Sequence, residues 1–410
     1  MTKPSITLIS LNYAPEDTAI GLYSSQMAAH LVRNGWKVQV VAGFPYYPNW
    51  EIAEDYQNKP NYFVEELNGV KVHRYKQFVP KDPTFINRSI QIVDFTLGNW
   101  FHLGKLKKTD VVISIIPYTS SSWLGNKLAK KMKAKHWIHI QDFEFDAAFE
   151  SGLTTKKGAM NLAASALFKL EKSILDKADL VSTISNGMLR QLESKTTVQN
   201  FFFPNWVDEE FINPNSYEKH PFLNNGKFNV LYSGNIGGKQ DWDLFVRVVK
   251  QFEDNKNIQF VIVGAGATRD KLANKLKNNN NVSFHNPVPY SDLNNLLCSA
   301  DLHVLFQKND VVDTVMPSKI LGMMASSVPS LVTGNSKSEV CSAFETSSGG
   351  FFIGSGALNQ ICNVIHDYSA NEILKNQHGI NARKFVLDNF TQNVILERFS
   401  KRLNELIEIN

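Results

Sequence analysis

The chain has 410 residues, of which 43% are hydrophobic and 20% are charged. This length exceeds that of one ordinary domain, and the composition excludes an intrinsically disordered chain, so two or three globular domains are expected. The net charge of +4 is concentrated in residues 1–205, which carry 24 Lys and Arg against 18 Asp and Glu. A basic first half favours an anionic partner.

The three cysteines, Cys298, Cys341 and Cys362, are an odd number without C-x-x-C spacing. They argue against a disulfide framework or a zinc site and fit a reducing compartment. The first residues lack the apolar core and cleavage site of a signal peptide, and no stretch approaches the ~18 apolar residues that cross a bilayer. We therefore expect a cytoplasmic protein.

In the first half, strands alternate with loops and helices. A strand over 6–11 leads through a loop to a helix over 23–33, which Asn34-Gly35 ends. Further strands are expected at 37–43, 70–75, 110–116, 135–141 and 179–185. This alternation predicts βαβ units and a parallel sheet.

The same rhythm restarts in the second half. Strands are expected at 228–234, 258–264, 281–286, 301–306 and 328–334. The sequence thus predicts an α/β protein with two Rossmann-like domains, over residues 1–205 and 206–385, and a closing helix over 386–410. Ligands of such domains bind at the carboxyl ends of the strands.

A glycine-rich loop follows the first strand of the second half. Gly234, Gly237 and Gly238 allow close approach of a ligand to the backbone before a helix begins near Asp241, and Lys239 adds a positive charge. The same glycines also suit a tight turn without a ligand. Asp241-Trp242-Asp243 is similar to a metal-binding D-x-D, but its position favours a helix cap, so we expect no metal.

A second candidate anion site lies where a strand meets a helix at 313–320. Pro317 suits the first helical turn, and Ser318 and Lys319 place a hydroxyl and an ammonium at the helix start. A capped helix with a solvated lysine is the alternative interpretation. Two such elements in one predicted domain favour an anion-binding function.

In the first half, titratable residues follow a strand at 138–146. His139 and Gln141 share one face of that strand, while Asp142, Glu144 and Asp146 lie at its end. A structural role for His139 remains the alternative. Gly21, before the first helix, is a candidate contact for an acceptor or a phosphate.

Basic and apolar stretches lie between these motifs. Residues 126–135 are rich in lysine, and residues 90–106 carry large apolar side chains. A solvated helix face and a core helix are the default interpretations, and docking on an anionic bilayer is the functional one. The chain has no motif of a nucleic-acid reader, so we expect no nucleic-acid partner.

Several segments together resemble family 4 of the glycosyltransferases, in the subgroup of colanic-acid and exopolysaccharide enzymes. They are NYAPEDTAIGLY (12–23), FPYYPNW (44–50), HIQDFEFDA (139–147), PNWVD (204–208), YSGNIGGKQ (232–240), VGAG (263–266), SADLHVL (299–305) and DTVMPSKI (313–320). The resemblance covers nearly the whole chain. It implies the GT-B fold, with two facing Rossmann-like domains and a last helix that crosses back, and retaining transfer without a metal.

The resemblance also assigns roles to residues. The donor diphosphate would contact Gly234, Asn235, Gly237, Lys239, Ser318 and Lys319. The base and ribose would contact Gly264, Gly266, Val288 and Pro289, and the donor sugar Asp313, Thr314, Met316 and Pro317. Asp142, with His139 nearby, would be the catalytic residue beside the acceptor, or would only orient groups there if the donor phosphate itself is the general base. Gly21 would face the diphosphate or acceptor.

The sequence departs from the family pattern at three places. Two glutamates common in the family are replaced by Thr314 and Gly322, an arginine after the glycine loop by Asn235, and a His-Asp pair by Gln141-Asp142. These departures favour Asp142 over a histidine as the catalytic residue. They also leave open a nucleotide-sugar epimerase, or a non-catalytic nucleotide-sugar-binding scaffold of a polysaccharide complex.

As a transferase, the protein is expected to use a UDP- or GDP-sugar and no other cofactor. Its expected acceptor is a saccharide on a polyprenyl diphosphate, used in cell-surface polysaccharide biosynthesis. It would then work as a peripheral protein on the cytoplasmic face of the membrane.

Overall fold

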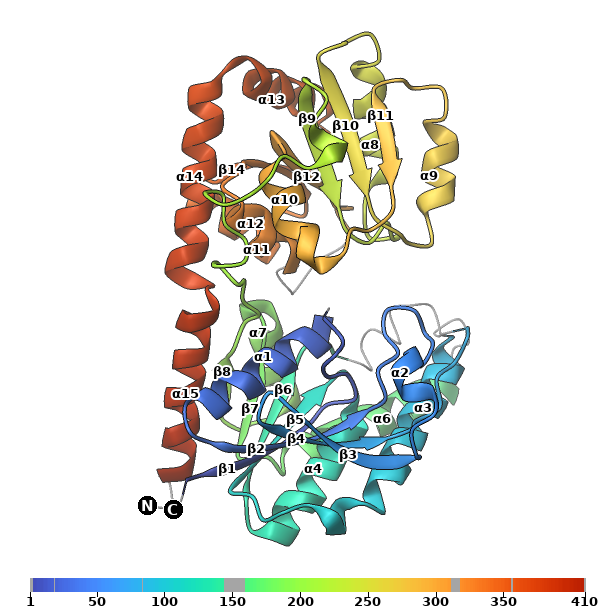
Figure 1. Cartoon of the computed structure of the whole chain (residues 1–410), viewed down its shortest axis with the longest axis vertical. Helices are drawn as coiled ribbons and strands as arrows, with labels where there is room; N and C mark the ends of the chain where they lie inside the picture. The colour runs from blue at the N-terminus through green and yellow to red at the C-terminus, as the bar shows by residue number, and fades with distance from the viewer. Residues whose placement is uncertain are drawn as a thin grey trace. The chain divides into compact units, whose positions relative to one another are not determined.

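The computed structural model describes residues 3–17, 19–82, 84–143, 159–310, 318–354 and 357–408. The chain divides into two compact units, one of Met1–Phe203 with Leu396–Asn410 and one of Pro204–Ile395. Figure 1 labels their elements. No helix in the described ranges has the length and hydrophobicity needed to cross a membrane.

The described part of the first unit contains an eight-stranded sheet in the order β3-β4-β2-β1-β5-β6-β7-β8. All neighbouring strands are parallel except β3 and β4. The strands are β1 (Ser5–Ile9), β2 (Lys37–Gly43), β3 (Tyr62–Leu67), β4 (Val70–Tyr75), β5 (Val111–Ile116), β6 (Lys135–Ile140), β7 (Leu180–Thr183) and β8 (Asn200–Phe202). The central strand β5 is buried along its whole length because helices cover both faces of the sheet.

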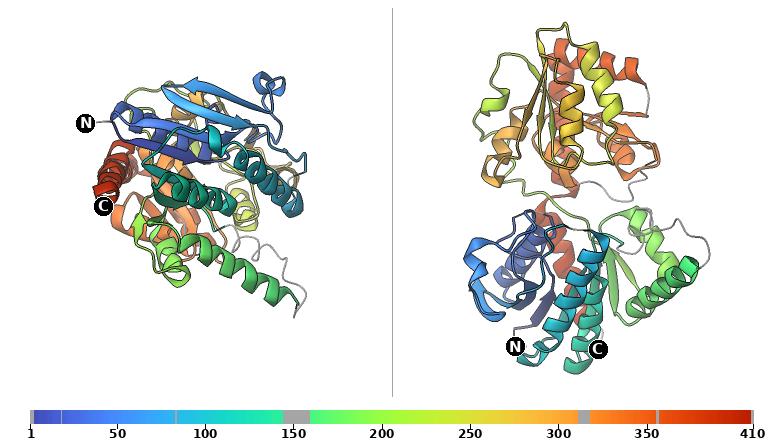
Figure 2. Two further views of the ribbon diagram at one scale, coloured as in Figure 1. Left: turned by 90° about the horizontal axis from the view of Figure 1, so that it is seen from below. Right: turned by 90° about the vertical axis from the view of Figure 1, so that its right-hand side faces the viewer.

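The helices of the first unit connect these strands. They are α1 (Ala19–Arg33), α2 (Glu54–Gln57), α3 (Phe85–Trp100), α4 (Thr119–Met132), α6 (Ala159–Leu175) and α7 (Asn186–Lys195). Helix α4 lies against β1, β5 and β6, and α3 runs beside α4 (Figure 2). Helix α3 leaves large apolar side chains exposed on its outer face.

The end of the chain completes the core of the first unit. Helix α15 (Gln392–Glu408) places Phe399 in a stack on Phe203, with ring centroids 4.8 Å apart, and 5.0 Å from the ring of Trp137. His30 of α1 hydrogen-bonds Ser400 at 2.8 Å. These contacts fix the C-terminal helix to the first unit.

The second unit has, over its described residues, a six-stranded sheet in the order β11-β10-β9-β12-β13-β14, parallel throughout. The strands are β9 (Phe228–Ser233), β10 (Ile258–Val263), β11 (Val282–His285), β12 (Leu302–Phe306), β13 (Ser330–Gly334) and β14 (Gly350–Gly354). The helices are α8 (Trp242–Gln251), α9 (Arg269–Lys275), α10 (Leu293–Cys298), α11 (Ser318–Ala325), α12 (Glu339–Ser347), α13 (Leu358–Ala370) and α14 (Glu372–Asn389).

The predicted α/β class is confirmed, with differences in detail. All the predicted strands are present, whereas β3, β8 and β14 were not predicted. The helix expected from residue 23 begins at Ala19. The single closing helix expected over 386–410 is the end of α14 followed by α15, because Phe390 and Thr391 leave the helix to pair with Val207.

Candidate functional site

The glycine-rich loop of the second unit extends the pairing of β9 with β10. Beyond Ser233, the N–H of Gly234 donates to the carbonyl of Val263 at 2.9 Å, and the N–H of Ile236 donates to the carbonyl of Ala265 at 2.8 Å. The N–H of Gly237 donates to the side chain of Gln240 at 3.1 Å. These three N–H groups are used inside the unit, so they fix the shape of the loop.

Glycine is required where the loops after β9 and β10 touch. A Cβ on Gly264 would lie 2.0 Å from the carbonyl oxygen of Gly234, and one on Gly266 would lie 2.6 Å from the side-chain oxygen of Asn235. Gly234 itself has a φ of +131°, which side chains rarely allow. The carboxyl end of the sheet therefore presents two loops packed backbone to backbone.

Lys319 of α11 brings a positive charge to this loop. Its Nζ donates to the hydroxyl of Tyr232 at 3.2 Å and lies 4.9 Å from the centre of the Tyr232 ring. A Cβ on Gly234 would be 2.9 Å from the same Nζ. The hydroxyl of Tyr232 donates in turn to the carbonyl of Asn235 at 2.6 Å, and burial raises the pKa of Tyr232. Tyr232 therefore couples Lys319 to the glycine loop.

The rest of the loop is more exposed. Asn235 and Lys239 lie at its surface, and the carbonyl of Lys239 accepts from the N–H of Lys308 at 3.1 Å. Asp241 caps α8, as predicted, by accepting from the N–H of Leu244 at 2.9 Å, while Asp243 forms an ion pair with Lys275. No group of three or more His, Cys, Asp or Glu in the described ranges is arranged to hold a metal ion.

A pocket of about 790 Å³ opens beside these loops in the same unit. Val288 and Pro289 line it, as do three residues that the sequence analysis did not identify, Phe222, Arg269 and His285. The rings of Phe222 and His285 stack with centroids 3.8 Å apart. Burial, with the nearby charges of His220 and Arg269, lowers the pKa of His285. The pocket therefore combines a flat aromatic surface with a guanidinium group.

Arg269 is the first residue of α9 and follows the Gly264–Thr268 loop. Its Nε atom is buried and has no hydrogen-bond partner among the described residues. A buried donor without a partner is costly, so a ligand or water is expected to accept from it. An arginine three residues after the VGAG segment, at the start of the next helix, was the signal in the sequence that could have identified it.

In the first unit, His139 is buried within the sheet. Its Nδ1 lies 2.8 Å from the hydroxyl of Ser182, and its Nε2 lies 3.0 Å from the amide nitrogen of Gln141. Because that amide nitrogen can only donate, Nε2 accepts and Nδ1 carries the proton. Burial lowers the pKa of His139 to about 3, so the ring is neutral at pH 7. In this setting, His139 positions Gln141 at the end of β6.

Asp142 follows Gln141 and is exposed at the carboxyl end of β6. The next residue, Phe143, is buried, and the ammonium of Lys195 lies 5.0 Å from the centre of its ring. Lys195 also pairs with the buried Glu171 at 2.7 Å. These contacts anchor the chain directly after Asp142. Glu144 and Asp146 lie outside the described residues.

Gly21 lies inside α1, where its neighbour is a carboxylate. A Cβ on Gly21 would lie 2.8 Å from Cβ of Glu16 and 3.1 Å from one of its carboxylate oxygens. Glu16 therefore packs directly against Gly21, and contact of Gly21 with a phosphate or an acceptor stays a prediction.

The predicted donor-sugar residues Asp313, Thr314, Met316 and Pro317 lie outside the described residues. Ser318 is the first residue of α11, and the position of its side chain is likewise outside the description. The structure thus brings together Gly234, Asn235, Gly237, Lys239 and Lys319 around one loop.

Two families of known proteins match the chain. "Glycosyl transferase 4-like domain" matches residues 18–206, and "Glycosyl transferases group 1" matches residues 215–385. The chain is also 31% identical over 356 residues to WcaI of Escherichia coli (strain K12), named as a glycosyl transferase of colanic acid biosynthesis. That alignment covers 84% of this chain and 86% of WcaI.

Solved structures show the same fold. Sucrose-phosphate synthase from Thermosynechococcus elongatus superposes with a TM-score of 0.75 at 15% identity over 100% of both chains. HepE of Anabaena, solved in complex with UDP-glucose, superposes with a TM-score of 0.67 at 11% identity over 98% of this chain and 99% of its own. This protein therefore belongs to the group 1, family 4-like glycosyltransferases of the GT-B fold.

Proposed function

We propose that the protein transfers a sugar from a UDP- or GDP-sugar to a saccharide acceptor carried on a lipid diphosphate, with retention of anomeric configuration and without a metal ion. The observation that carries this proposal is the placement of Lys319 against the glycine loop, beside Gly234 and Tyr232. The similarity to a relative named for colanic acid biosynthesis supports a role in the synthesis of a surface polysaccharide.

The chemistry requires positive charge at the donor diphosphate. The bond between the anomeric carbon and the diphosphate oxygen breaks, the acceptor oxygen bonds to the same carbon on the same face, and the acceptor proton passes to the departing phosphate. Negative charge develops on the leaving group, and fixed cations stabilise it. Since the N–H groups of Gly234, Ile236 and Gly237 are already bonded, Lys319 and Lys239 supply this charge.

The 790 Å³ pocket suits the nucleoside part of the donor. A base can stack on Phe222 and His285, and Arg269 can donate through its unpartnered Nε to a ribose or base oxygen. HepE, which has the same fold, is known with UDP-glucose, and this supports a nucleotide sugar as the donor class. Asp142, exposed at the end of β6, is the proposed acceptor-side residue.

Calorimetric titration with UDP and GDP in EDTA tests this donor site. We expect one nucleotide to bind, with the affinity falling about 10-fold or more in Lys319→Ala and Lys239→Ala, since a lost charge-assisted contact costs about 1.5–3 kcal/mol. Lys256→Ala is the matched control, because Lys256 is exposed in the turn before β10, at the amino ends of the strands and away from the glycine loop. Absence of binding by either nucleotide at millimolar concentration would contradict the proposed donor site.

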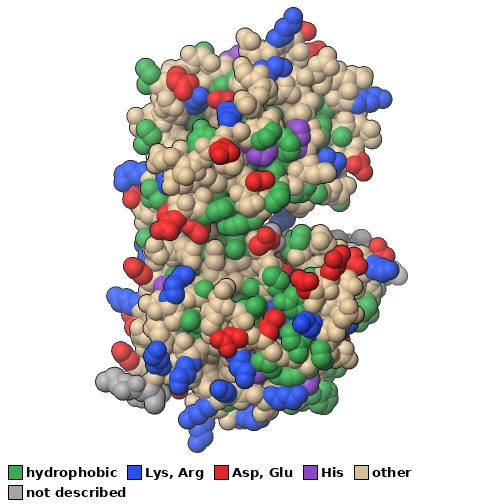
Figure 3. All heavy atoms as spheres, viewed as in Figure 1, with side chains coloured by type: hydrophobic (Ala, Val, Ile, Leu, Met, Phe, Trp, Pro, Cys, Tyr) green, Lys and Arg blue, Asp and Glu red, His purple; other side chains and the backbone are tan. Residues whose placement is uncertain are grey.

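We further propose that the first unit docks on an anionic membrane through α3. Ile86, Ile90, Val93, Leu97 and Phe101 follow helical spacing and are all at least 50% exposed. Figure 3 shows apolar side chains gathered over the region where Figure 1 places α3. An apolar helix face of this kind can lie in the interface of a bilayer.

Basic residues adjoin this face. Lys127 of α4 lies 5.4 Å from the ring of Trp123, and Trp123 lies 5.0 Å from Trp100 at the end of α3. Lys130, Lys131 and Lys133 are exposed on the same helix or directly after it. Each lysine near an anionic surface contributes about 1 kcal/mol.

Sedimentation with anionic liposomes separates the two contributions. Ile90→Ser with Leu97→Ser should weaken binding at all salt concentrations. Replacement of Lys130, Lys131, Lys133 and Lys135 by Gln should weaken it mainly at low salt. Ile373→Ser with Ile380→Ser, exposed on α14, is the control. Unchanged sedimentation of the α3 variant would remove α3 as the docking face.

A further inference from the structure

A small pocket lies in the first unit between the loops that follow β1 and β2. It has a volume of about 140 Å³ and is lined by residues 15–17 on one side and by residues from 45 to 53 on the other. The volume equals that of about five water molecules, so the open pocket encloses part of one sugar ring and is too small for an oligosaccharide. The resemblance to known enzymes assigned no role to this pocket.

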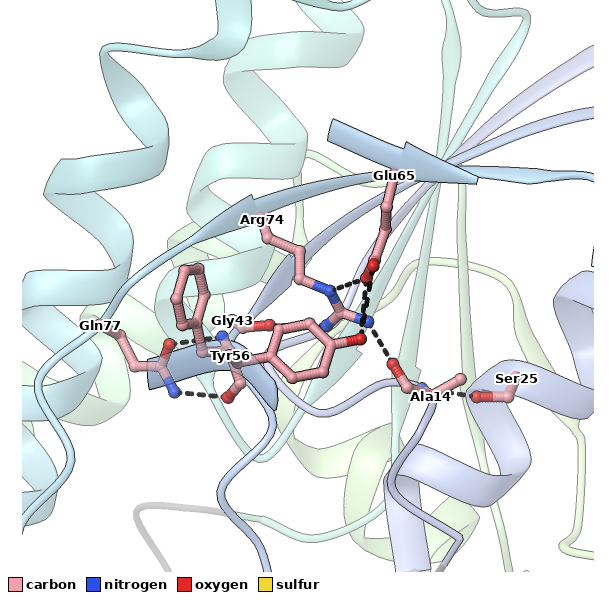
Figure 4. Close-up of polar contacts among 8 residues, drawn as sticks. Ala14, Ser25, Gly43, Tyr56, Glu65, Arg74 and Gln77 are labelled. Carbon is pink, nitrogen blue, oxygen red and sulfur yellow. Dashed lines mark hydrogen bonds and ion pairs between the residues drawn. The ribbon is translucent and has the colours of Figure 1, made fainter. Parts of the chain in front are cut away.

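The two walls are fixed from behind by a buried arginine. Arg74 of β4 is 0% exposed and donates to the carbonyl of Ala14, directly before one wall, and, at 2.8 Å, to the carbonyl of Gly43, shortly before the other (Figure 4). Its Nε forms an ion pair with Glu65 of β3. Gln77 adds two hydrogen bonds to the backbone of Phe44, of 2.7 and 2.9 Å.

A buried carboxylate ties one wall directly to the other. Glu16 accepts from the backbone N–H groups of Tyr46 and Tyr47, both at 2.9 Å, and from the side-chain amide of Asn12 at 2.9 Å. Burial raises the pKa of Glu16 in spite of these bonds. The position of the Tyr46–Tyr47 segment therefore depends on Glu16.

Burying these charged groups is energetically unfavourable. Removing an arginine and a carboxylate from water costs several kcal/mol each. Apolar side chains of similar volume at these positions would make the folded protein equally stable. What the buried charges provide is a fixed geometry for both loops. Preorganised walls lower the entropy cost of binding a ligand between them.

The chemistry of the pocket rim indicates the class of ligand. Tyr47 is 40% exposed, so its ring offers an apolar face, and Asp17, Asn49 and Glu51 are exposed hydrogen-bond acceptors around it. The residues that line the pocket include no lysine or arginine. Hydroxyl groups can donate to these acceptors, whereas a phosphate would be repelled by the carboxylates.

We infer that this pocket binds one neutral pyranose ring of the acceptor saccharide, stacked on Tyr47 with its hydroxyls donating to Asp17 and Glu51. The identification of this ring with the acceptor rests on the proposed transferase function. The binding site itself rests only on the pocket and its walls. Under this inference, the diphosphate of the acceptor binds to another part of the protein.

Saturation-transfer NMR with methyl pyranosides of glucose, galactose, mannose and N-acetylglucosamine at millimolar concentration tests this inference. We expect saturation transfer to at least one of them, reduced at least fivefold in Tyr47→Ala and in Asp17→Asn. Tyr217→Ala is the matched control, because Tyr217 is 42% exposed in the second unit, and it should leave the signal unchanged. Inorganic pyrophosphate should not displace the sugar.

Absence of a signal, an equal signal in Tyr47→Ala, or displacement by pyrophosphate would overturn the inference. Titration of Tyr47→Ala with UDP and GDP separates this failure from that of the proposed function, since the proposed donor site lies in the other unit. Nucleotide binding without a pyranoside signal would refute the pocket alone. A Tyr47-dependent pyranoside signal without nucleotide binding would uphold the pocket and refute the donor site.

Discussion

The contact between the two glycine loops allows a prediction from a single methyl group. In Gly264→Ala, the new Cβ would lie 2.0 Å from the carbonyl oxygen of Gly234, whereas ordinary contacts begin at 3.4 Å. The glycine loop would have to withdraw by roughly 1.4 Å, a shift comparable to those that disable ligand positioning. The hydrogen bond from Gly234 to Val263 opposes that movement.

Overpacking costs about 1–3 kcal/mol and a strained hydrogen bond about 1 kcal/mol, so a loss of about 3 kcal/mol is expected. For a domain of this size, that loss lowers Tm by roughly 6–12 °C. Because the loop also positions Lys319, nucleotide affinity should fall at least 10-fold.

Gly238→Ala is the matched control in the same loop. No atom lies within 4 Å of a Cβ at Gly238, and its φ is not in the left-handed range. Its stability should stay within about 0.5 kcal/mol of the parent. Differential scanning calorimetry and nucleotide titration on both variants are the assays. An unchanged Tm and affinity in Gly264→Ala, or equal damage in Gly238→Ala, would refute the packing of the two loops.

Three further predictions concern the first unit and the donor lysine. Arg74→Ala should destabilise the protein by about 3–5 kcal/mol in urea unfolding, because it removes the ion pair of Glu65 and the donor to two carbonyls. The exposed Arg88→Ala should cost under about 1 kcal/mol, and similar values for the two variants would exclude the buried ion pair. Burial lowers the pKa of His139 to about 3, below its value in the unfolded chain, so the stability of the protein should fall as the pH drops below about 6.5. His139→Gln should remove about 2 kcal/mol of the stability loss between pH 7 and pH 5. An unchanged loss in this variant would mean that the imidazole is not held neutral. Lys319→Ala should lower kcat/KM for transfer by about 10²–10³, because it removes one group that stabilises the developing negative charge. Its Tm should stay close to that of the parent. An effect on KM alone would mean that Lys319 contributes only to substrate binding.

Sequence reasoning succeeded where a pattern is local. A run such as Val111–Ile116 is wholly apolar and becomes the central buried strand β5. By contrast, β3 was missed because YFVEEL mixes charged with apolar residues. Asn68-Gly69, both with positive φ, forms the two-residue turn that joins β3 to β4, and this Asn-Gly pair was the available signal.

The donor-side loop shows where local reasoning ends. Its glycines were identified from spacing, and Lys319 from its place at a helix start. The link between them runs through Tyr232, a core position 87 residues from Lys319, and no local pattern reports it. Arg74 is similar, since a single arginine in the strand VKVHRY gives no sign that it binds carbonyls 60 and 31 residues away.

Analysis of the reaction products tests the central proposal most directly. The protein would be incubated in EDTA with labelled UDP- and GDP-sugars and a polyprenyl-diphosphate-linked saccharide, and the lipid fraction analysed by NMR. We predict that label enters the lipid-linked saccharide with the anomeric configuration of the donor, and that an equal amount of nucleoside diphosphate is released. Donor that stays intact, an epimerised nucleotide sugar, or an inverted linkage would contradict the proposed function.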